Sequence, residues 1–355
     1  MLVQALIWDK RFDAALKAAD AFQAKYPDLP APTTYRGSIL LMQDRKNLEL
    51  ARREFQRALK LDRGYVPAAH NLAMLAWSEG KADEARQHYK DVLKQKPDDL
   101  PTLMGLYALE VKAKRPAEAR RYLASAAENH PQAPAPSLLL GQVLLTEGNP
   151  LKAIEVTRVA ARTSPNSDAL VELRAAAFRA TGDTANALTN YRRLVQLRPA
   201  SADAQFEFAT AHAALKDRAA YREALLKALA LAPAHLRARS ALARLDLAEA
   251  RPAEAVRIAR ELQKELPKDP EGFILEAEAL RLQGDAARSV QVMEQYQKQN
   301  DGELQPRALL VNSYVQAGAK DKALKLARET EAANPGHPYA LELLAQTQTA
   351  TGDPK

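Results

Sequence analysis

The chain has 355 residues and no cysteine, which excludes disulfides, thiolate catalysis and cysteine-ligated zinc. Aromatic residues make up 6% of the sequence and apolar residues 47%, so the core must be built mainly from Ala and Leu, which favours packed helices over strands. The formal net charge of +7 is a modest excess for this length, and much of it lies between residues 216 and 260, where ten Lys or Arg stand against five Asp or Glu.

Such a basic stretch can attract nucleic acid, anionic lipid or acidic polysaccharide, although solvated helix faces are the simpler explanation. No basic motif with interleaved aromatic residues accompanies it, so we expect no nucleic-acid partner. No apolar run approaches the length of a membrane span, and Met1 is not followed by the pattern of a secretory signal peptide. We therefore expect contact with a membrane only through an anchor outside this chain.

Prolines recur at a constant step along most of the chain, equal to the spacing of Pro97 and Pro131. The series contains Pro97, Pro131, Pro165, Pro199, Pro233, Pro267 and, two steps further, Pro335. A second series with the same step contains Gly80, Gly148, Gly182, Gly284, Gly318 and Gly352. Apolar residues at helical spacing flank each glycine, as in Ala85, Tyr89 and Val92. Each period therefore predicts a helix, a tight turn, a second helix and a turn marked by proline.

In chain order, this period divides the sequence into one partial repeat, nine full repeats and a second partial repeat. The predicted bounds are 1–29, 30–65, 66–99, 100–133, 134–167, 168–201, 202–235, 236–269, 270–303, 304–337 and 338–355. The step from Ala15 to Ala51 is longer than this period by two positions. The two extra residues predict a longer turn between the two helices of the repeat 30–65, within "QDRKNLE".

The turn glycine, the terminal proline and the small residues where helices cross match the tetratricopeptide repeat, whose period is about 34 residues. The segment "ALKLDRGYVPAAHNLAMLAWSEGKADEARQHYKDVLKQKPDD" resembles that family closely. The resemblance implies an all-α fold, a right-handed α-solenoid of stacked antiparallel helix pairs, and a single array over residues 1–355. It also implies a protein whose partners bind in the concave groove of the superhelix.

The phrases "ARREFQRALKLD", "NLAMLAWSEGKADEARQHYKDVLKQKPDD" and "LLLGQVLLTEGNP" are similar to those of long tetratricopeptide lipoproteins in bacterial exosortase (PEP-CTERM) and exopolysaccharide systems. This resemblance implies a periplasmic or outer-membrane-associated protein with a lipid anchor upstream. The repeat period places Met1 inside an expected helix, so we expect the chain to be a fragment of a longer array. Two alternatives stay open. One is a cytoplasmic adaptor, and the other is the regulatory arm of an enzyme whose catalytic domain lies outside this chain.

The first helix of each pair should line the groove and carry the residues that contact a partner. The candidates are His70, Met74, Trp77, Met104, Val111, Gln142, Arg179, Phe206, Arg244, Arg281 and Asn312. They are apolar in the first part of the chain and include arginines in the second, which suits a peptide with an apolar end and an acidic end. Met74 and Trp77 are the strongest, and packing between helices is the alternative role for every candidate.

Sequence motifs for catalysis and for metal binding are missing. The six histidines form no HExxH motif and no close pair, and neither GxSxG, Walker A nor GxGxxG occurs. The groove positions that hold a peptide carboxylate in related clamp proteins are here mostly Met, Ala, Leu and Gln. We therefore predict a scaffold that binds a protein or peptide, with no catalytic activity, no cofactor and no metal. A contact with acidic polysaccharide through residues 216–260 stays open.

Overall fold

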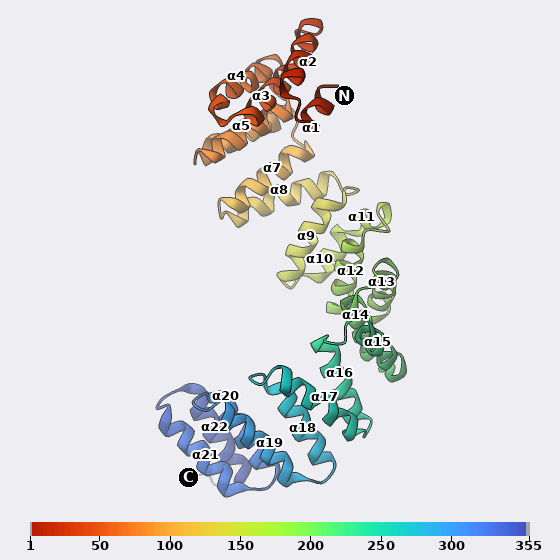
Figure 1. Cartoon of the computed structure of the whole chain (residues 1–355), viewed down its shortest axis with the longest axis vertical. Coiled ribbons are helices and arrows are strands. Elements are labelled where there is room, and N and C mark those ends of the chain that lie inside the picture. The colour runs from red at the N-terminus through yellow and green to blue at the C-terminus, as the bar shows by residue number, and fades with distance from the viewer. Residues whose placement is uncertain (1, 353–355) are drawn as a thin grey trace. The chain divides into compact units, whose positions relative to one another are not determined.

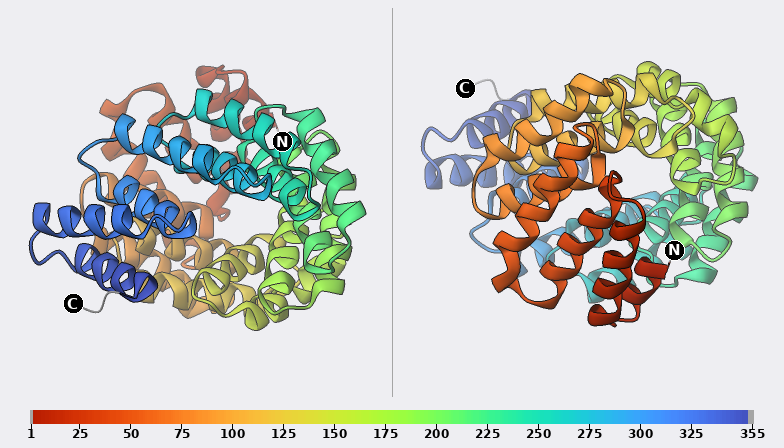
Figure 2. Two further views of the ribbon diagram at one scale, coloured as in Figure 1. Left: turned by 90° about the horizontal axis from the view of Figure 1, so that it is seen from below. Right: turned by 90° about the horizontal axis from the view of Figure 1, so that it is seen from above.

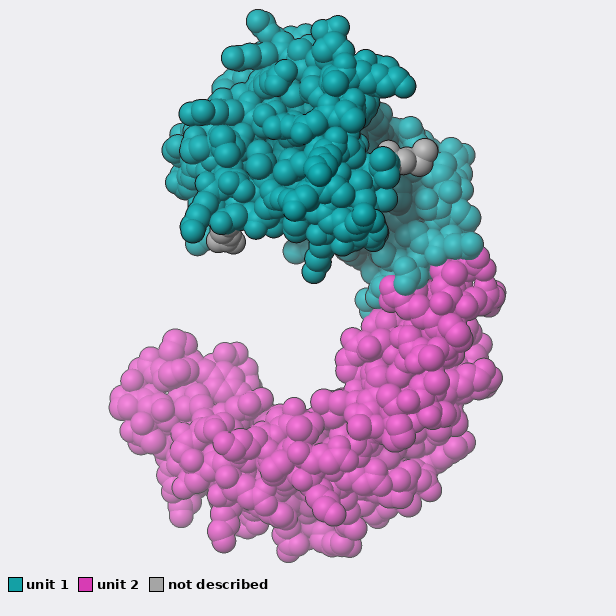
Figure 3. Space-filling model, turned by 45° about the horizontal axis from the view of Figure 1, so that its top comes forward, with its two compact units in different colours: residues 1–183 teal, residues 184–355 magenta. Residues whose placement is uncertain are grey.

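The computed structural model describes residues 2–352, and every regular element in that range is a helix (Figure 1). Contacts divide the chain into two compact units, residues 1–183 and 184–355, which are described separately below (Figure 3). None of the helices in the described range is long and apolar enough to cross a membrane. The predicted all-α fold of stacked antiparallel helix pairs is confirmed.

Unit 1 contains the first twelve α-helices and one short 3-10 helix. Their bounds are α1 (Leu2–Trp8), α2 (Phe12–Lys25), α3 (Pro30–Gln43), η1 (Arg45–Asn47), α4 (Leu48–Leu61), α5 (Val66–Ser78), α6 (Ala82–Gln95), α7 (Leu100–Lys112), α8 (Pro116–Asn129), α9 (Pro134–Thr146), α10 (Pro150–Val156), α11 (Arg158–Thr163) and α12 (Asp168–Ala180). The element η1 occupies the turn that the longer step from Ala15 to Ala51 predicts to be extended.

Unit 2 contains the remaining ten α-helices. Their bounds are α13 (Thr184–Leu197), α14 (Ala202–Ala214), α15 (Arg218–Leu231), α16 (Leu236–Ala248), α17 (Pro252–Glu265), α18 (Pro270–Leu282), α19 (Ala286–Gln299), α20 (Leu304–Gln316), α21 (Lys320–Ala333) and α22 (Pro338–Thr351). Within each unit, neighbouring pairs stack side by side along the chain (Figure 2).

The tight turn inside a helix pair requires one residue with a positive φ. Gly80 ends the turn after α5 with φ 77°, a conformation that glycine adopts without steric cost. Lys114, Lys216 and Ala250 occupy the equivalent turns with φ between 56° and 59°, although each carries a Cβ. These turns therefore all contain a residue with a positive φ, although that residue is not always glycine, which adopts this conformation most easily.

Small residues let the two helices of a pair approach closely. Ala73 of α5 and Ala85 of α6 are both buried in one apolar cluster. Proline at the start of α8, α9, α10, α17 and α18 fixes a helical φ where no intrahelical N–H bond is lost. Alanine contacts therefore let the helices of a pair pack closely, and prolines fix where several first and second helices begin.

One second helix differs from the uninterrupted helix that the period predicts. It is divided at Thr157 into α10 and α11. The hydroxyl of Thr157 donates to the carbonyl oxygen of Ala153 at 2.7 Å, and Nη1 of Arg174 donates to that of Ile154 at 2.7 Å. Arg174 belongs to α12, the first helix of the next repeat. Its guanidinium therefore occupies a carbonyl oxygen of the preceding helix, and the helix is interrupted at this point.

Candidate functional site

The predicted groove residues occupy three repeating positions on the first helices. In α5 these positions are His70, Met74 and Trp77, and the same positions recur once in every repeat along both units. Because the side chains lie three and four residues apart, they share one helical face. The face therefore carries a different triplet of side chains in every repeat.

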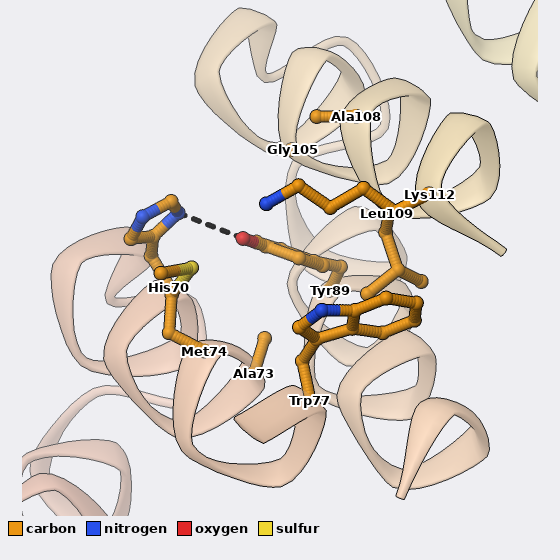
Figure 4. Close-up of a pocket in the computed structure, with 9 residues that line it drawn as sticks. All are labelled: His70, Ala73, Met74, Trp77, Tyr89, Gly105, Ala108, Leu109 and Lys112. Atoms are coloured by element: carbon orange, nitrogen blue, oxygen red, sulfur yellow. Dashed lines mark hydrogen bonds between the residues drawn. The ribbon is translucent and has the colours of Figure 1, made fainter. Parts of the chain in front are cut away.

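In unit 1, α5, α6 and α7 form a small pocket on this face, which we call the anchor pocket (Figure 4). Its volume is about 70 Å³, and its lining residues are His70, Ala73, Met74, Trp77, Tyr89, Gly105, Ala108, Leu109 and Lys112. Met74 is exposed at 51%, although it belongs to a helix that packs against its neighbours. The structure thus brings three of the predicted residues together and adds Tyr89, Gly105 and Lys112.

Gly105 gives the Tyr89 ring its place in the pocket. A Cβ at residue 105 would lie 2.8 Å from two ring atoms of Tyr89, which is too close for a carbon contact. Tyr89 itself is buried, and its hydroxyl lies 2.7 Å from Nδ1 of His70. The wall of the anchor pocket is therefore fixed by backbone geometry on one side and by a hydrogen bond on the other.

Desolvation shifts the pKa of both partners in that hydrogen bond. It raises the pKa of Tyr89 to about 12, so the hydroxyl keeps its proton at neutral pH. Desolvation also lowers the pKa of His70 below 6.5, so the imidazole is neutral at pH 7 and Nδ1 can accept the proton of Tyr89. Lys112 then carries the positive charge at the anchor pocket. Its amino group lies on the side of the pocket where the hydroxyl of Tyr89 meets His70 (Figure 4).

The other candidates in unit 1 lie outside the anchor pocket. Met104 is partly buried and packs against two apolar clusters. Val111, Gln142 and Arg179 are exposed on α7, α9 and α12. The side chains of these residues belong to the same helical face, but the structure does not gather them into one cavity.

Three of the four candidates in unit 2 do not line the pocket to which the fourth, Asn312, belongs. Phe206 is exposed at only 9%, because the ring of His235 packs against it and the guanidinium of Arg237 lies 4.4 Å from its centroid. Arg244 donates two hydrogen bonds to Glu271, at 3.1 and 2.8 Å. Arg281 is exposed on α18. Phe206 is thus a core residue here, and Arg244 has a partner within the chain.

Asn312 lines a second pocket, which we call the polar pocket. Its volume is about 150 Å³, and its lining residues are Ile274, Ala277, Glu278, Ser289, Met293, Leu309, Asn312, Ser313 and Gln316. All of these residues belong to α18, α19 and α20 of unit 2. Unlike the anchor pocket, the polar pocket has a carboxylate and two amides in its wall.

Sequence reasoning missed Tyr89 and Lys112 as pocket residues. Tyr89 lies on the apolar face that the helical spacing of Ala85, Tyr89 and Val92 predicts, and it is buried, but it also lines the anchor pocket. Lys112 is the last residue of α7, and its side chain points back over the preceding turn, as side chains of helices generally do. The signal in the sequence is its place directly after Val111, which is the residue equivalent to Trp77 in the next repeat.

The basic stretch 216–260 is largely neutralised by carboxylates. Eight of its ten cations lie within ion-pair distance of Asp or Glu, namely Arg222, Lys227, Arg237, Arg239, Arg244, Arg251, Arg257 and Arg260. Within the described range, no group of three or more His, Asp or Glu side chains is placed to hold a metal ion. The candidate sites are therefore the anchor pocket in unit 1 and the polar pocket in unit 2.

Comparisons with known proteins agree with this geometry. A model of the tetratricopeptide repeat matches residues 43–109, and a second model of that repeat matches residues 109–168. No curated protein matches the chain.

Two solved structures of tetratricopeptide proteins are similar in fold, and a third matches over a shorter part of the chain. One from Parabacteroides merdae has 21% identity and a TM-score of 0.52 over 70% of this chain and 98% of its own. The C-terminal part of a Cytophaga hutchinsonii repeat protein has 17% identity and a TM-score of 0.50 over 67% and 96%. YrrB, a protein with an unusual peptide-binding site, has 21% identity and a TM-score of 0.46 over 53% and 96%. Residues 43–168 are therefore tetratricopeptide repeats, and the helix pairs of the described chain have the fold of that superfamily.

Proposed function

We propose that this chain is a binding scaffold without catalysis of its own, and that it takes an apolar side chain of a partner peptide into the anchor pocket. The observation that carries the proposal is the exposure of Met74 beside Trp77 over an apolar cavity on packed helices. Solvent-exposed apolar side chains around a concave site are typical of the surfaces where soluble proteins bind their partners. A peptide that covered them would remove apolar surface from water.

The anchor pocket is shaped before a partner arrives. Tyr89 is held by Gly105 and His70, so little side-chain freedom is lost on its side of the interface. Lys112 forms no ion pair with any described residue, and it can meet an acidic side chain next to the apolar anchor of the peptide. The preferred ligand is thus a peptide with a large apolar residue flanked by Asp or Glu.

This function can be tested with peptides selected from a displayed library against the full chain. We expect a consensus of an apolar residue beside an acidic one, with affinity measured by fluorescence anisotropy of a labelled peptide. Replacing Met74 and Trp77 together by Ala should weaken binding at least about tenfold, as expected for central apolar anchors.

The matched control replaces Trp8 and Met42 by Ala. These residues have the same side chains, are exposed at 87% and 54% in the same unit and lie outside the anchor pocket. Their replacement should leave the affinity unchanged. Equal losses in the two double variants, or no loss in either, would show that the peptide binds elsewhere.

We further propose that the scaffold acts in the bacterial envelope, in assembly of exopolysaccharide or in exosortase-linked export. The support is the resemblance of three repeat phrases to lipoproteins of those systems. The partner on this proposal is a protein. An acidic polysaccharide is a weaker candidate ligand, because carboxylates of the chain already neutralise most cations of residues 216–260. Fractionation of the native host should find the protein with the periplasm or outer membrane, and a cytoplasmic location would instead support the general adaptor.

A further inference from the structure

The anchor pocket and the polar pocket are formed by equivalent positions of the repeat. Six repeat lengths separate them in the sequence. The pairs of equivalent residues are His70 and Ile274, Ala73 and Ala277, Met74 and Glu278, Tyr89 and Met293, Gly105 and Leu309, Ala108 and Asn312, Leu109 and Ser313, and Lys112 and Gln316. The same backbone arrangement therefore carries two different sets of side chains, one in each unit.

The charge of the two pockets is opposite. The anchor pocket contains Lys112 and no carboxylate, whereas the polar pocket contains Glu278 and no cation. Glu278 is half-buried, and no hydrogen bond or ion pair joins its carboxylate to any residue that the structure describes. Arg281 lies one turn further along α18, but it forms no ion pair with Glu278. A carboxylate without a partner in a cavity favours a cationic ligand.

The rest of the polar pocket suits a cation on an aliphatic chain. Ile274, Met293 and Leu309 supply an apolar floor against which methylene groups can pack. Asn312, Ser313 and Gln316 supply side-chain oxygens, and none of the three side chains has a hydrogen-bond partner among the described residues. This arrangement of one carboxylate with separate acceptor oxygens around it matches an ammonium group. Its three N–H donors point in different directions and are not confined to one plane.

We propose that the polar pocket binds a primary alkylammonium group, as presented by a lysine side chain of a partner protein. The methylene stem lies on Ile274 and Met293, and the ammonium donates to Glu278 and to the side-chain oxygens of Asn312 or Ser313. This site lies wholly in unit 2, so it does not depend on peptide binding at the anchor pocket.

Methyl NMR of the full chain labelled at methionine can test the site. The chain has five methionines, of which Met293 lines the polar pocket and Met74 the anchor pocket. The probe is n-butylammonium, which reproduces the end of a lysine side chain, and n-butanol is its uncharged counterpart. We expect a saturable shift of the Met293 signal with n-butylammonium, and half-saturation with n-butanol at a concentration about tenfold higher or more.

Replacing Glu278 by Gln keeps the shape of the side chain and removes the charge. It should raise the half-saturating concentration of n-butylammonium about tenfold, while the circular dichroism spectrum and the urea midpoint of the chain stay unchanged, which shows that the fold is intact. The matched control is Arg281→Gln, which changes a neighbouring charge on α18 and should not weaken binding. A Met293 response that is equal for the two probes, or that survives in the Glu278→Gln variant, would overturn the proposal.

Discussion

Arg86 of α6 and Glu110 of α7 form a buried ion pair that joins one repeat to the next. Nη2 of Arg86 lies 3.1 Å from Oε2 of Glu110, and both residues are buried. The hydrogen bond to Glu110 is the main cause that raises the pKa of Arg86. Four repeats later, Arg222 occupies the position of Arg86 and Asp246 that of Glu110, with Nη2 and Oδ1 2.6 Å apart. The same ion pair therefore connects successive repeats in both units.

Replacing Glu110 by Ala should destabilise unit 1 strongly. It would leave the guanidinium of Arg86 buried without its main partner, and breaking a buried pair in this way costs about 3–5 kcal/mol. Urea denaturation followed by circular dichroism measures the change. The midpoint for Glu110→Ala should fall far more than that for Glu118→Ala, which removes a carboxylate from an exposed ion pair on α8.

The apolar version of this pair occurs in the chain itself. Val256 and Leu280 occupy the positions equivalent to Arg86 and Glu110, and Leu280 is buried. The double variant Arg86→Val, Glu110→Leu should therefore regain most of the free energy of unfolding that Glu110→Ala loses. A double variant as unstable as Glu110→Ala would mean that the charges themselves are needed at this contact.

Replacing Ala250 by Gly should stabilise unit 2, although it removes a methyl group. Ala250 has φ 56°, and relief of this left-handed conformation favours glycine by about 1 kcal/mol. The next turn provides the reverse experiment, because Gly284 has φ 81° and a Cβ there would meet no neighbour. Gly284→Ala should lose stability from backbone strain alone. Urea midpoints that move in the same direction for both variants would contradict this explanation.

The helix pairs could be predicted from the sequence because each depends on local residues that recur. Gly80 and Pro97 mark turns by their own backbone preferences, and the constant step of their two series fixes where the helices begin and end. The break at Thr157 could not be predicted, because its cause is Arg174 on another helix. Phe206 has the sequence position of a groove residue, yet Arg237 and His235 cover it. Periodicity predicts the face of a residue, whereas its exposure depends on neighbours distant in sequence.

Stability should decrease as the pH falls from about 7.5 to about 5.5. Desolvation lowers the pKa of His70 and His88 in the folded chain below the usual 6.5, so the unfolded chain binds more protons in this range. The free energy of unfolding is therefore highest above pH 6.5 and falls as the pH drops toward the folded pKa values. Urea midpoints at several pH values measure this slope, and the variant His70→Gln, His88→Gln should flatten it. An unchanged slope would assign the effect to other groups.

Replacing Gly105 by Ala should close the anchor pocket while the helices remain folded. The new methyl group would lie 2.8 Å from the ring of Tyr89, so the ring must move and its hydrogen bond to His70 must lengthen or break. Overpacking of this kind costs about 1–3 kcal/mol, and the higher helix propensity of Ala offsets part of it.

Two measurements distinguish a change in the anchor pocket from a loss of stability in the Gly105→Ala variant. The shift of the Met74 methyl signal reports the pocket, and the urea midpoint reports stability. The double variant Tyr89→Leu, Gly105→Ala should restore stability, because Leu123 occupies the equivalent position in the next repeat, where residue 139 is Leu rather than Gly. It should not restore peptide binding, since the ring that forms the wall is gone. Peptide affinity equal to that of the unaltered chain would show that Tyr89 contributes only to packing.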